Sequence, residues 1–314
     1  MGVLKRIVVG HDLRSSGDVA LRSALVLARR YRAAVKVIHV IEPLPFYQQL
    51  SHPFHFPPGP EEIARSAGAA LEMRLGNSQD MCVELHHEVS AGKPFVELIV
   101  ACRAWRADLI IVGTPADAPV LSFGSTRERV MRKAKVPVLV TPKPLMPDAK
   151  MFLVPIDFSP AALSAAREAL TLAIQFRARV CFLHVLDDYP LLVYPSADDP
   201  VGPIPQLSPK ELKAEWTSFL SKLRLENVAW EHKTLEGRSA ITIVEQAELR
   251  NADLIVMGTH GRSALESMLV GNVTETVTRN APCPVLTVRP WDHLLDFPDS
   301  PRAGQLSDRP SSRR

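Results

Sequence analysis

Apolar residues follow two patterns along this chain. Short runs that are apolar at nearly every position, among them "RIVVG" (6–10), "AVKVIHVI" (34–41) and "ADLIIVG" (107–113), are rich in β-branched residues. Such runs are typical of parallel strands that helices cover on both faces. Between the runs, apolar residues recur at three- and four-residue spacing, which predicts amphipathic helices. In residues 16–31 this stripe consists of Val19, Ala20, Ala24, Leu27, Ala28 and Tyr31.

Two further pairs of segments differ from the buried strands. The segments "MCVELHHEV" (81–89) and "NVAWEHKTL" (227–235) alternate apolar and polar residues, which predicts strands with one solvated face near a sheet edge. The segments "VPVLVT" (136–141) and "CPVLTV" (283–288) are short, apolar and proline-bearing. An exposed edge of that kind would be prone to aggregation, so we expect each of these last strands to be covered by the other.

The chain contains an internal repeat. Residues 5–45 and 150–190 match without a gap at 15 of 41 positions, with an offset of 145 that becomes 147 before "GSTRERVMRKAKVPVLV". Repeats of this length are whole domains. We therefore predict two domains, 1–143 and 144–290, each a doubly wound five-stranded α/β parallel sheet, arranged as an intramolecular pseudo-dimer. Residues 291–314 are polar and predict a disordered tail.

The segment between the two repeats and the overall composition add further expectations. Three prolines in "TPKPLMPDAK" (141–150) predict a short, stiff, extended linker. A net charge of +3 is too small to indicate nucleic-acid binding, and the basic runs "RRYR" (29–32) and "RKAK" (132–135) read as solvated helix ends. Four scattered cysteines, no signal peptide and no membrane-length apolar run predict a cytoplasmic protein.

A ligand site is expected at the carboxyl ends of the strands in the second half. Asp157 follows the first strand of that half and Gly258 follows the fourth. In open parallel sheets ligands bind at this edge, where the strand order reverses. Glycines at 258 and 261 would let backbone N–H groups approach a ligand closely and adopt positive φ.

A third glycine lies where the next helix begins. After Gly271, Asn272 and Glu275 have the spacing of an N-x-x-E capping box, and the amides at such a helix start favour an anion such as phosphate. No Lys follows any of the glycines, so the loop is not a Walker P-loop, and the first βα turn lacks a GxGxxG dinucleotide motif.

The spacing Gly-two-Gly-nine-Gly after a strand, with an Asp ending the first strand, resembles the nucleotide-binding signature of the universal stress protein family in its tandem, two-domain form. This resemblance covers residues 5–290 and implies the adenine nucleotide alpha hydrolase-like fold, pairing through the last strand, and ATP as ligand, with or without Mg²⁺. It implies that Asp157 and Val185 lie at the adenosine end. Residues implied around the ribose and phosphates are Met257, Gly258, Gly261, Arg262, Gly271, Asn272 and Val273. The family usually has Ser or Thr where this chain has Asn272.

The first half carries an eroded version of the same motif. Gly113 and Thr114 remain, but the loop before Gly124 is two residues shorter than its counterpart. The replacements that disfavour a phosphate are Pro115, Ala116, Asp117 and Pro119, of which Asp117 stands in the place of Arg262. Ser125 and Glu128 retain the capping-box spacing, while Asp12 and Val40 match Asp157 and Val185. We expect no triphosphate to bind here in the same way.

Four histidines are candidate functional residues, but none is predicted to be catalytic or to bind a metal. His39 and His184 recur at one repeat position inside an apolar run, which favours a structural histidine with satisfied hydrogen bonds over a catalytic one. His52 and His55 lack an evident third ligand, so no metal site is predicted.

The predicted function is that of an ATP-binding module in the stress response, with the nucleotide held mainly by the second half and no catalytic residue identified. Two alternatives stay open. A triphosphate beside Asp157 and Arg262 would allow slow ATP hydrolysis, and the proline-rich segment 41–60 would suit a protein-interaction scaffold that binds no nucleotide. Protein partners and further association of two chains also stay open.

Overall fold

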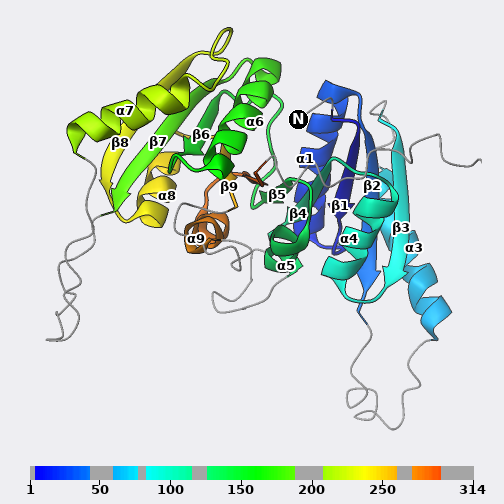
Figure 1. Cartoon of the computed structure of the whole chain (residues 1–314). Coiled ribbons are helices and arrows are strands. Elements are labelled where there is room, and N and C mark those ends of the chain that lie inside the picture. Colours follow the sequence, from blue (N-terminus) through cyan, green and yellow to red (C-terminus); the bar gives the residue numbers. More distant parts are fainter. Residues whose placement is uncertain are drawn as a thin grey trace, which may run out of the picture.

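The computed structural model describes residues 4–42, 59–76, 83–114, 126–187, 208–259 and 271–290. In both halves strands alternate with helices, as the hydrophobic pattern predicts (Figure 1). The first half consists of β1 (Arg6–Gly10), α1 (Ser15–Tyr31), β2 (Ala34–Ile41), α3 (Pro60–Gly76), β3 (Leu85–Ala91), α4 (Pro94–Ala104), β4 (Leu109–Gly113), α5 (Thr126–Lys133) and β5 (Val138–Thr141). The second half consists of β6 (Met151–Pro155), α6 (Pro160–Phe176), β7 (Arg179–Asp187), α7 (Pro209–Leu220), β8 (Trp230–Gly237), α8 (Ser239–Leu249), β9 (Leu254–Gly258), α9 (Asn272–Asn280) and β10 (Val285–Val288).

The described strands form one ten-stranded sheet in the order β3-β2-β1-β4-β5-β10-β9-β6-β7-β8. Each half thus has the reversing order of a doubly wound sheet, with parallel pairing throughout. The alternating strands β3 and β8 lie at the two outer edges, as predicted.

The two halves meet where β5 and β10 pair antiparallel, which confirms that the last strands cover one another. Leu139 lies opposite Leu286 at the centre of this pairing. These two leucines occupy the same repeat position, because they are 147 residues apart. Antiparallel pairing of equivalent residues places an approximate two-fold axis at this point. Equivalent helices of the two halves therefore lie on the same face of the sheet.

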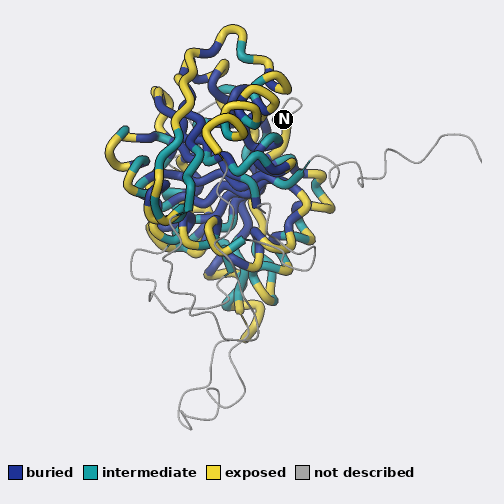
Figure 2. Tube along the Cα trace, turned by 60° about the vertical axis from the view of Figure 1, so that its left-hand side comes forward, coloured by how far each residue is buried: buried dark blue, intermediate teal, exposed yellow. Residues whose placement is uncertain are grey.

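Helices cover both faces of the sheet, and the two faces differ. On one face, α1, α3, α6 and α7 pack over a single apolar core that runs through both halves. On the other face, α4 and α5 cover one core in the first half, while α8 and α9 cover a separate core in the second. Figure 2 shows the buried residues gathered along the sheet and the exposed residues on the outer sides of the helices. The halves therefore share more than a strand pairing.

The linker is packed, contrary to the prediction of an extended spacer. Leu145 is buried, and its N–H donates to the Ser23 hydroxyl at 3.0 Å. A turn follows in which the N–H of Ala149 donates to the carbonyl of Met146. Apolar burial and these hydrogen bonds outweigh the preference of the three prolines for extended backbone.

In the basic run at the end of α1, Arg29 and Arg32 are exposed as predicted, whereas Arg30 is half-buried. The Arg30 guanidinium donates to the carbonyls of Pro147, at 2.8 Å, and Gln175. It also lies over the ring of Phe176, 4.2 Å from the centroid, as in a cation–π contact. Arg30 therefore fastens α1 to both the linker and α6.

Cys102, Cys181 and Cys283 are buried as free thiols. Burial raises the pKa of Cys102 and Cys283 to about 12 and that of Cys181 to about 11, so these thiols are unreactive at neutral pH. Cys82 lies outside the described residues. Among the helices described, none has the length and apolar character needed to cross a membrane.

Candidate functional site

The candidate site lies at the carboxyl ends of β6 and β9, where the strand order of the second half reverses. Asp157 follows β6, and its Oδ1 accepts hydrogen bonds from the N–H and hydroxyl of Ser159, at 3.1 and 2.6 Å. In the first half, Asp12 Oδ1 accepts from the N–H groups of Arg14 and Gly17, both at 3.0 Å. The residue after each aspartate has φ near +60°. Both carboxylates thus shape the turn that leads into the following helix.

The recurring histidines support the same turn. Nδ1 of His39 donates to the carbonyl of His11 at 2.8 Å, and Nδ1 of His184 donates to the carbonyl of Ile156 at 2.6 Å. Each accepting carbonyl belongs to the residue immediately before the aspartate of its repeat, Asp12 or Asp157. The predicted structural role of both histidines is confirmed.

Gly258 ends β9, but its backbone does not have the predicted positive φ. A Cβ there would lie 2.8 Å from the Cβ of Ala161 and 2.9 Å from its carbonyl carbon. In the first half, a Cβ on Gly113 would lie 2.1 Å from the carbonyl oxygen of Ser16. Both glycines are therefore required because the first turn of a helix, α6 or α1, packs directly on the end of the strand. Met257, which precedes Gly258, is a buried core residue.

Gly271 has a different environment. It is the N-cap residue of α9, with φ of −73° and ψ of 148°. Among the described residues, the nearest atom to a Cβ placed there is the carbonyl oxygen of Thr259, at 3.8 Å. That carbonyl accepts the Gly271 N–H at 2.8 Å, and the Thr274 hydroxyl donates to the carbonyl of Gly258 at 2.9 Å. The start of α9 is thereby fixed to the end of β9, and no second described atom lies within 4 Å of a Cβ placed on Gly271.

The predicted capping box at the start of α9 is wrong. The helix begins at Asn272, so Glu275 is its fourth residue, and no side chain caps the helix. The Glu275 carboxylate instead contacts Arg132, at 3.3 Å, and Arg279, at 3.4 Å. Two guanidinium groups outcompete one backbone amide for a carboxylate, because both partners are then charged.

In the described part of the chain, the backbone donors of the first turn of α9 have no acceptor. Among the described residues, no group accepts a hydrogen bond from the N–H of Asn272, Val273 or Thr274. The side chains of Asn272 and Val273 are exposed. Aligned N–H groups at a helix start carry partial positive charge and attract an anion.

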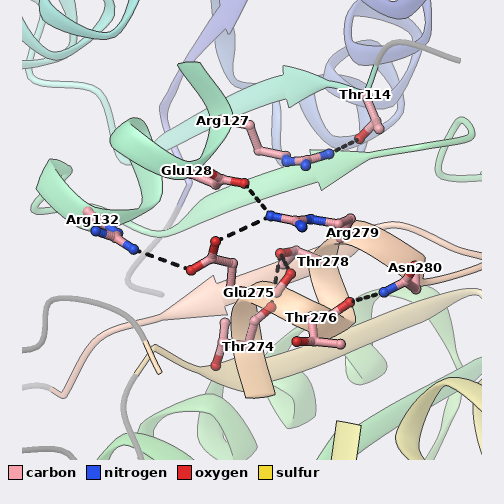
Figure 3. A network of polar contacts seen from close by, with 10 residues as sticks. All are labelled: Thr114, Arg127, Glu128, Arg132, Thr274, Glu275, Thr276, Thr278, Arg279 and Asn280. Atoms are coloured by element: carbon pink, nitrogen blue, oxygen red, sulfur yellow. Dashed lines mark hydrogen bonds and ion pairs between the residues drawn. The ribbon is translucent and has the colours of Figure 1, made fainter. Parts of the chain in front are cut away.

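Four charged side chains link α5 and α9 across the two halves (Figure 3). Arg279 Nη2 lies 2.9 Å from Glu128 Oε1, while Arg132 Nη2 lies 3.3 Å from Glu275 Oε2. We call Glu128, Arg132, Glu275 and Arg279 the cross-half network. This network was not predicted, because Arg132 was interpreted as part of a solvated basic run. A Glu and an Arg four residues apart occur at matching positions of both repeats, and this recurrence was the sequence signal that could have indicated the network.

The remaining predicted residues are only partly placed. Val185 lies near the carboxyl end of β7, half-buried and packed beside the core under α8. Within the described ranges, no cluster of three or more His, Cys, Asp or Glu side chains is arranged to hold a metal ion. The following residues of the sequence analysis lie outside the described residues: Gly261, Arg262, Pro115, Ala116, Asp117, Pro119, Gly124, Ser125, His52 and His55.

Known proteins resemble this chain along most of its length. The family model described as "Universal stress protein family" matches residues 4–142 and again 149–289. A universal stress protein of Methanocaldococcus jannaschii is 39% identical over 144 residues, which is 45% of this chain and 82% of that protein. One of Mycolicibacterium smegmatis is 28% identical over 312 residues, 90% of this chain and 97% of that protein.

Solved structures agree on the fold. A crystal structure of a universal stress protein from Archaeoglobus fulgidus has a TM-score of 0.67 at 19% identity, with 91% of this chain and 98% of that chain covered. The family model accounts for most of both halves. The chain therefore belongs to the universal stress protein family, in a tandem form with two copies of the family's domain.

Proposed function

We propose that the second half binds an adenine nucleotide, ATP, at the carboxyl ends of β6 and β9, and that the protein acts as a nucleotide-dependent module in the stress response. The phosphates lie against the first turn of α9, and Asp157 and Val185 border the adenosine. Gly261 and Arg262 belong to the same site by the family pattern.

The observation that supports this proposal best is the set of free amides at Asn272, Val273 and Thr274. They open α9 at the switch point of the sheet, and the helix dipole adds positive potential there. At Gly271, neither the φ nor the packing against described residues demands a glycine, and in the described part of the chain its side-chain position is open. A phosphate group satisfies all of these features together.

The first half differs at the matching positions, which supports a preference for the second. Thr274 is replaced by Arg127, whose Nη1 donates to the Thr114 hydroxyl at 3.4 Å. A long cationic side chain thus takes the place of a short hydroxyl side chain in the first turn of the matching helix, α5. Together with Asp117 and the two loop prolines, this arrangement favours a supporting role for the first half.

Calorimetric titration with ATP, of protein first freed of any co-purified nucleotide, tests the proposal. The decisive variant is Gly271→Asp. Aspartate is a favourable N-cap, so its carboxylate would accept from the free amides, keep α9 stable and exclude phosphate. We expect ATP binding to be lost and the free energy of unfolding to be retained.

The repeat supplies the control. Gly124→Asp makes the same change at the matched position of the first half, and we expect ATP affinity to stay unchanged. No heat of binding by the wild type at millimolar ATP overturns the proposal, and equal losses in both variants overturn the preference for the second half. Phosphate release measured in the same samples detects slow ATP hydrolysis.

A further inference from the structure

The cross-half network repeats itself under the two-fold relation of the halves. Glu128 and Glu275 are 147 residues apart, as are Arg132 and Arg279. Each glutamate contacts the arginine of the opposite half, at 2.9 Å and 3.3 Å (Figure 3). The network therefore belongs to the joint between the halves, and its two contacts between opposite halves both connect α5 with α9.

Glu275 brings this joint within one helical turn of the free amides of α9. Its backbone N–H donates to the Gly271 carbonyl at 3.1 Å, which closes the first turn of the helix. Its carboxylate is only 18% exposed. A carboxylate in the first turn is itself attracted to the helix amides, and its charge repels a phosphate bound there. Where the Glu275 side chain is held thus matters for an anion at Asn272 to Thr274.

We propose that Arg132, from the first half, is a positioning residue for the nucleotide site of the second half: it holds the Glu275 carboxylate away from the α9 amides and neutralises its charge. Arg279 shares Glu275 at 3.4 Å but lies closer to Glu128, at 2.9 Å. Arg279 therefore divides its positive charge between Glu128 and Glu275, and Arg132 supplies the further positive charge that neutralises Glu275. The inference rests on the proposed function, and it gives the first half a part in nucleotide binding without a ligand of its own.

Titration of three variants with ATP tests the inference. In Arg132→Gln, Glu275 loses one of its two guanidinium partners, and we expect ATP affinity to fall by about threefold to tenfold. In Arg132→Gln with Glu275→Gln, no charge needs compensation, and we expect affinity to return to within about twofold of the wild type. Glu275→Gln alone should bind at least as tightly as the wild type.

The affinity of the double variant distinguishes two explanations of a weaker Arg132→Gln variant. If Arg132 positions Glu275, removing the glutamate charge as well restores ATP affinity. If Arg132→Gln merely loosens the joint between the halves, removing a second residue of the cross-half network weakens ATP binding further. The matched control is Arg129→Gln, since Arg129 is an exposed residue of the same helix and its removal changes the net charge equally. Affinity should not change there.

Each outcome bears on a different claim. A wild type that binds no ATP overturns the proposed function. Equal affinities of Arg132→Gln and Arg129→Gln, or a double variant as weak as Arg132→Gln, overturn the inference alone. If Arg132→Gln fails to fold, Glu275→Gln still decides, because weaker binding of ATP by that variant contradicts an opposing role of the carboxylate.

Discussion

Glu128 and Arg279 lie 2.9 Å apart across the joint between the two halves, although 151 residues separate them in the chain. The Glu128 side chain is 5% exposed and that of Arg279 is 26% exposed. The repeat-related pair, Arg132 and Glu275, is 3.3 Å apart with exposures of 49% and 18%. Two pairs that are equivalent in sequence are thus unequal in burial.

This inequality predicts unequal contributions to stability. Glu128→Gln removes the closer of two carboxylates that contact Arg279 and leaves Glu275 at 3.4 Å, so we expect it to lower the free energy of unfolding by about 2 kcal/mol. Arg132→Gln should cost at most about 1 kcal/mol, because half of its side chain is solvated. Urea unfolding followed by circular dichroism measures both. Similar losses in the two variants would show that burial does not separate the pairs.

The hydrophobic pattern and the internal repeat were sufficient to predict the architecture. Apolar runs located the central strands, because a strand buried on both faces is apolar at nearly every position. The alternating segments 81–89 and 227–235 located the edge strands, because a strand buried on one face alternates apolar and polar residues. The pairing of β5 with β10 followed from the need to cover an apolar edge. Each of these features depends on local pattern alone.

The candidate site was predicted less completely, for physical reasons. The capping box failed because the partner of Glu275 is Arg132, a residue 143 positions away that only the joint between the halves brings near. The role of Gly258 was misread because close packing of a helix, unlike a turn, has no local signature. The linker was misread since the acceptor for the Leu145 N–H is Ser23, in α1.

The two kinds of glycine predict different responses to alanine. In Gly113→Ala the new Cβ would lie 2.1 Å from a backbone oxygen, and in Gly258→Ala 2.8 Å from a Cβ. We expect both to destabilise the fold by about 1–3 kcal/mol, Gly113→Ala more strongly. Gly271→Ala meets only one described atom, at 3.8 Å, and should cost about 0.5 kcal/mol, as a less favoured N-cap.

Thermal unfolding of the three variants, followed by differential scanning calorimetry, provides the measurement. A fourth variant, Gly68→Ala, is the control, because Gly68 lies within α3 and a Cβ there meets no described atom within 4 Å. It should stabilise the protein slightly, since alanine is the better helix former. A Gly258→Ala variant as stable as Gly271→Ala would contradict the packing role.

A polar cluster around the buried side chain of His11 is found in the first half. The His11 side chain is fully buried, with Nδ1 accepting from the Leu13 N–H at 3.0 Å and Nε2 lying 3.2 Å from Asp18 Oδ1. Asp18 Oδ2 in turn lies 2.6 Å from Arg74 Nη1. The N–H bond to Nδ1 requires that nitrogen to be unprotonated, so the imidazole is neutral with its proton on Nε2. The residues 145 positions later, Ile156, Leu163 and Phe219, are all apolar.

This cluster predicts a dependence of stability on pH. Burial lowers the pKa of His11 below its ordinary value of 6.5, and the opposing charges of Asp18 and Asp12 only partly offset this effect. The unfolded chain therefore takes up a proton first as the pH falls. Stability should be constant above about pH 6.5 and decrease below it, by at most about 1.4 kcal/mol per pH unit from this histidine.

The second half of the chain provides the matched control for that decrease. Replacing the cluster by its counterparts, His11→Ile with Asp18→Leu and Arg74→Phe, removes the titrating group and substitutes an apolar set that the same fold already accommodates. Such a replacement is often neutral or stabilising. Urea unfolding between pH 5 and 8 should show a shallower pH dependence in the triple variant than in the wild type. Identical profiles would show that His11 keeps an ordinary pKa in the folded protein, since only a pKa that differs between the folded and unfolded states makes stability depend on pH.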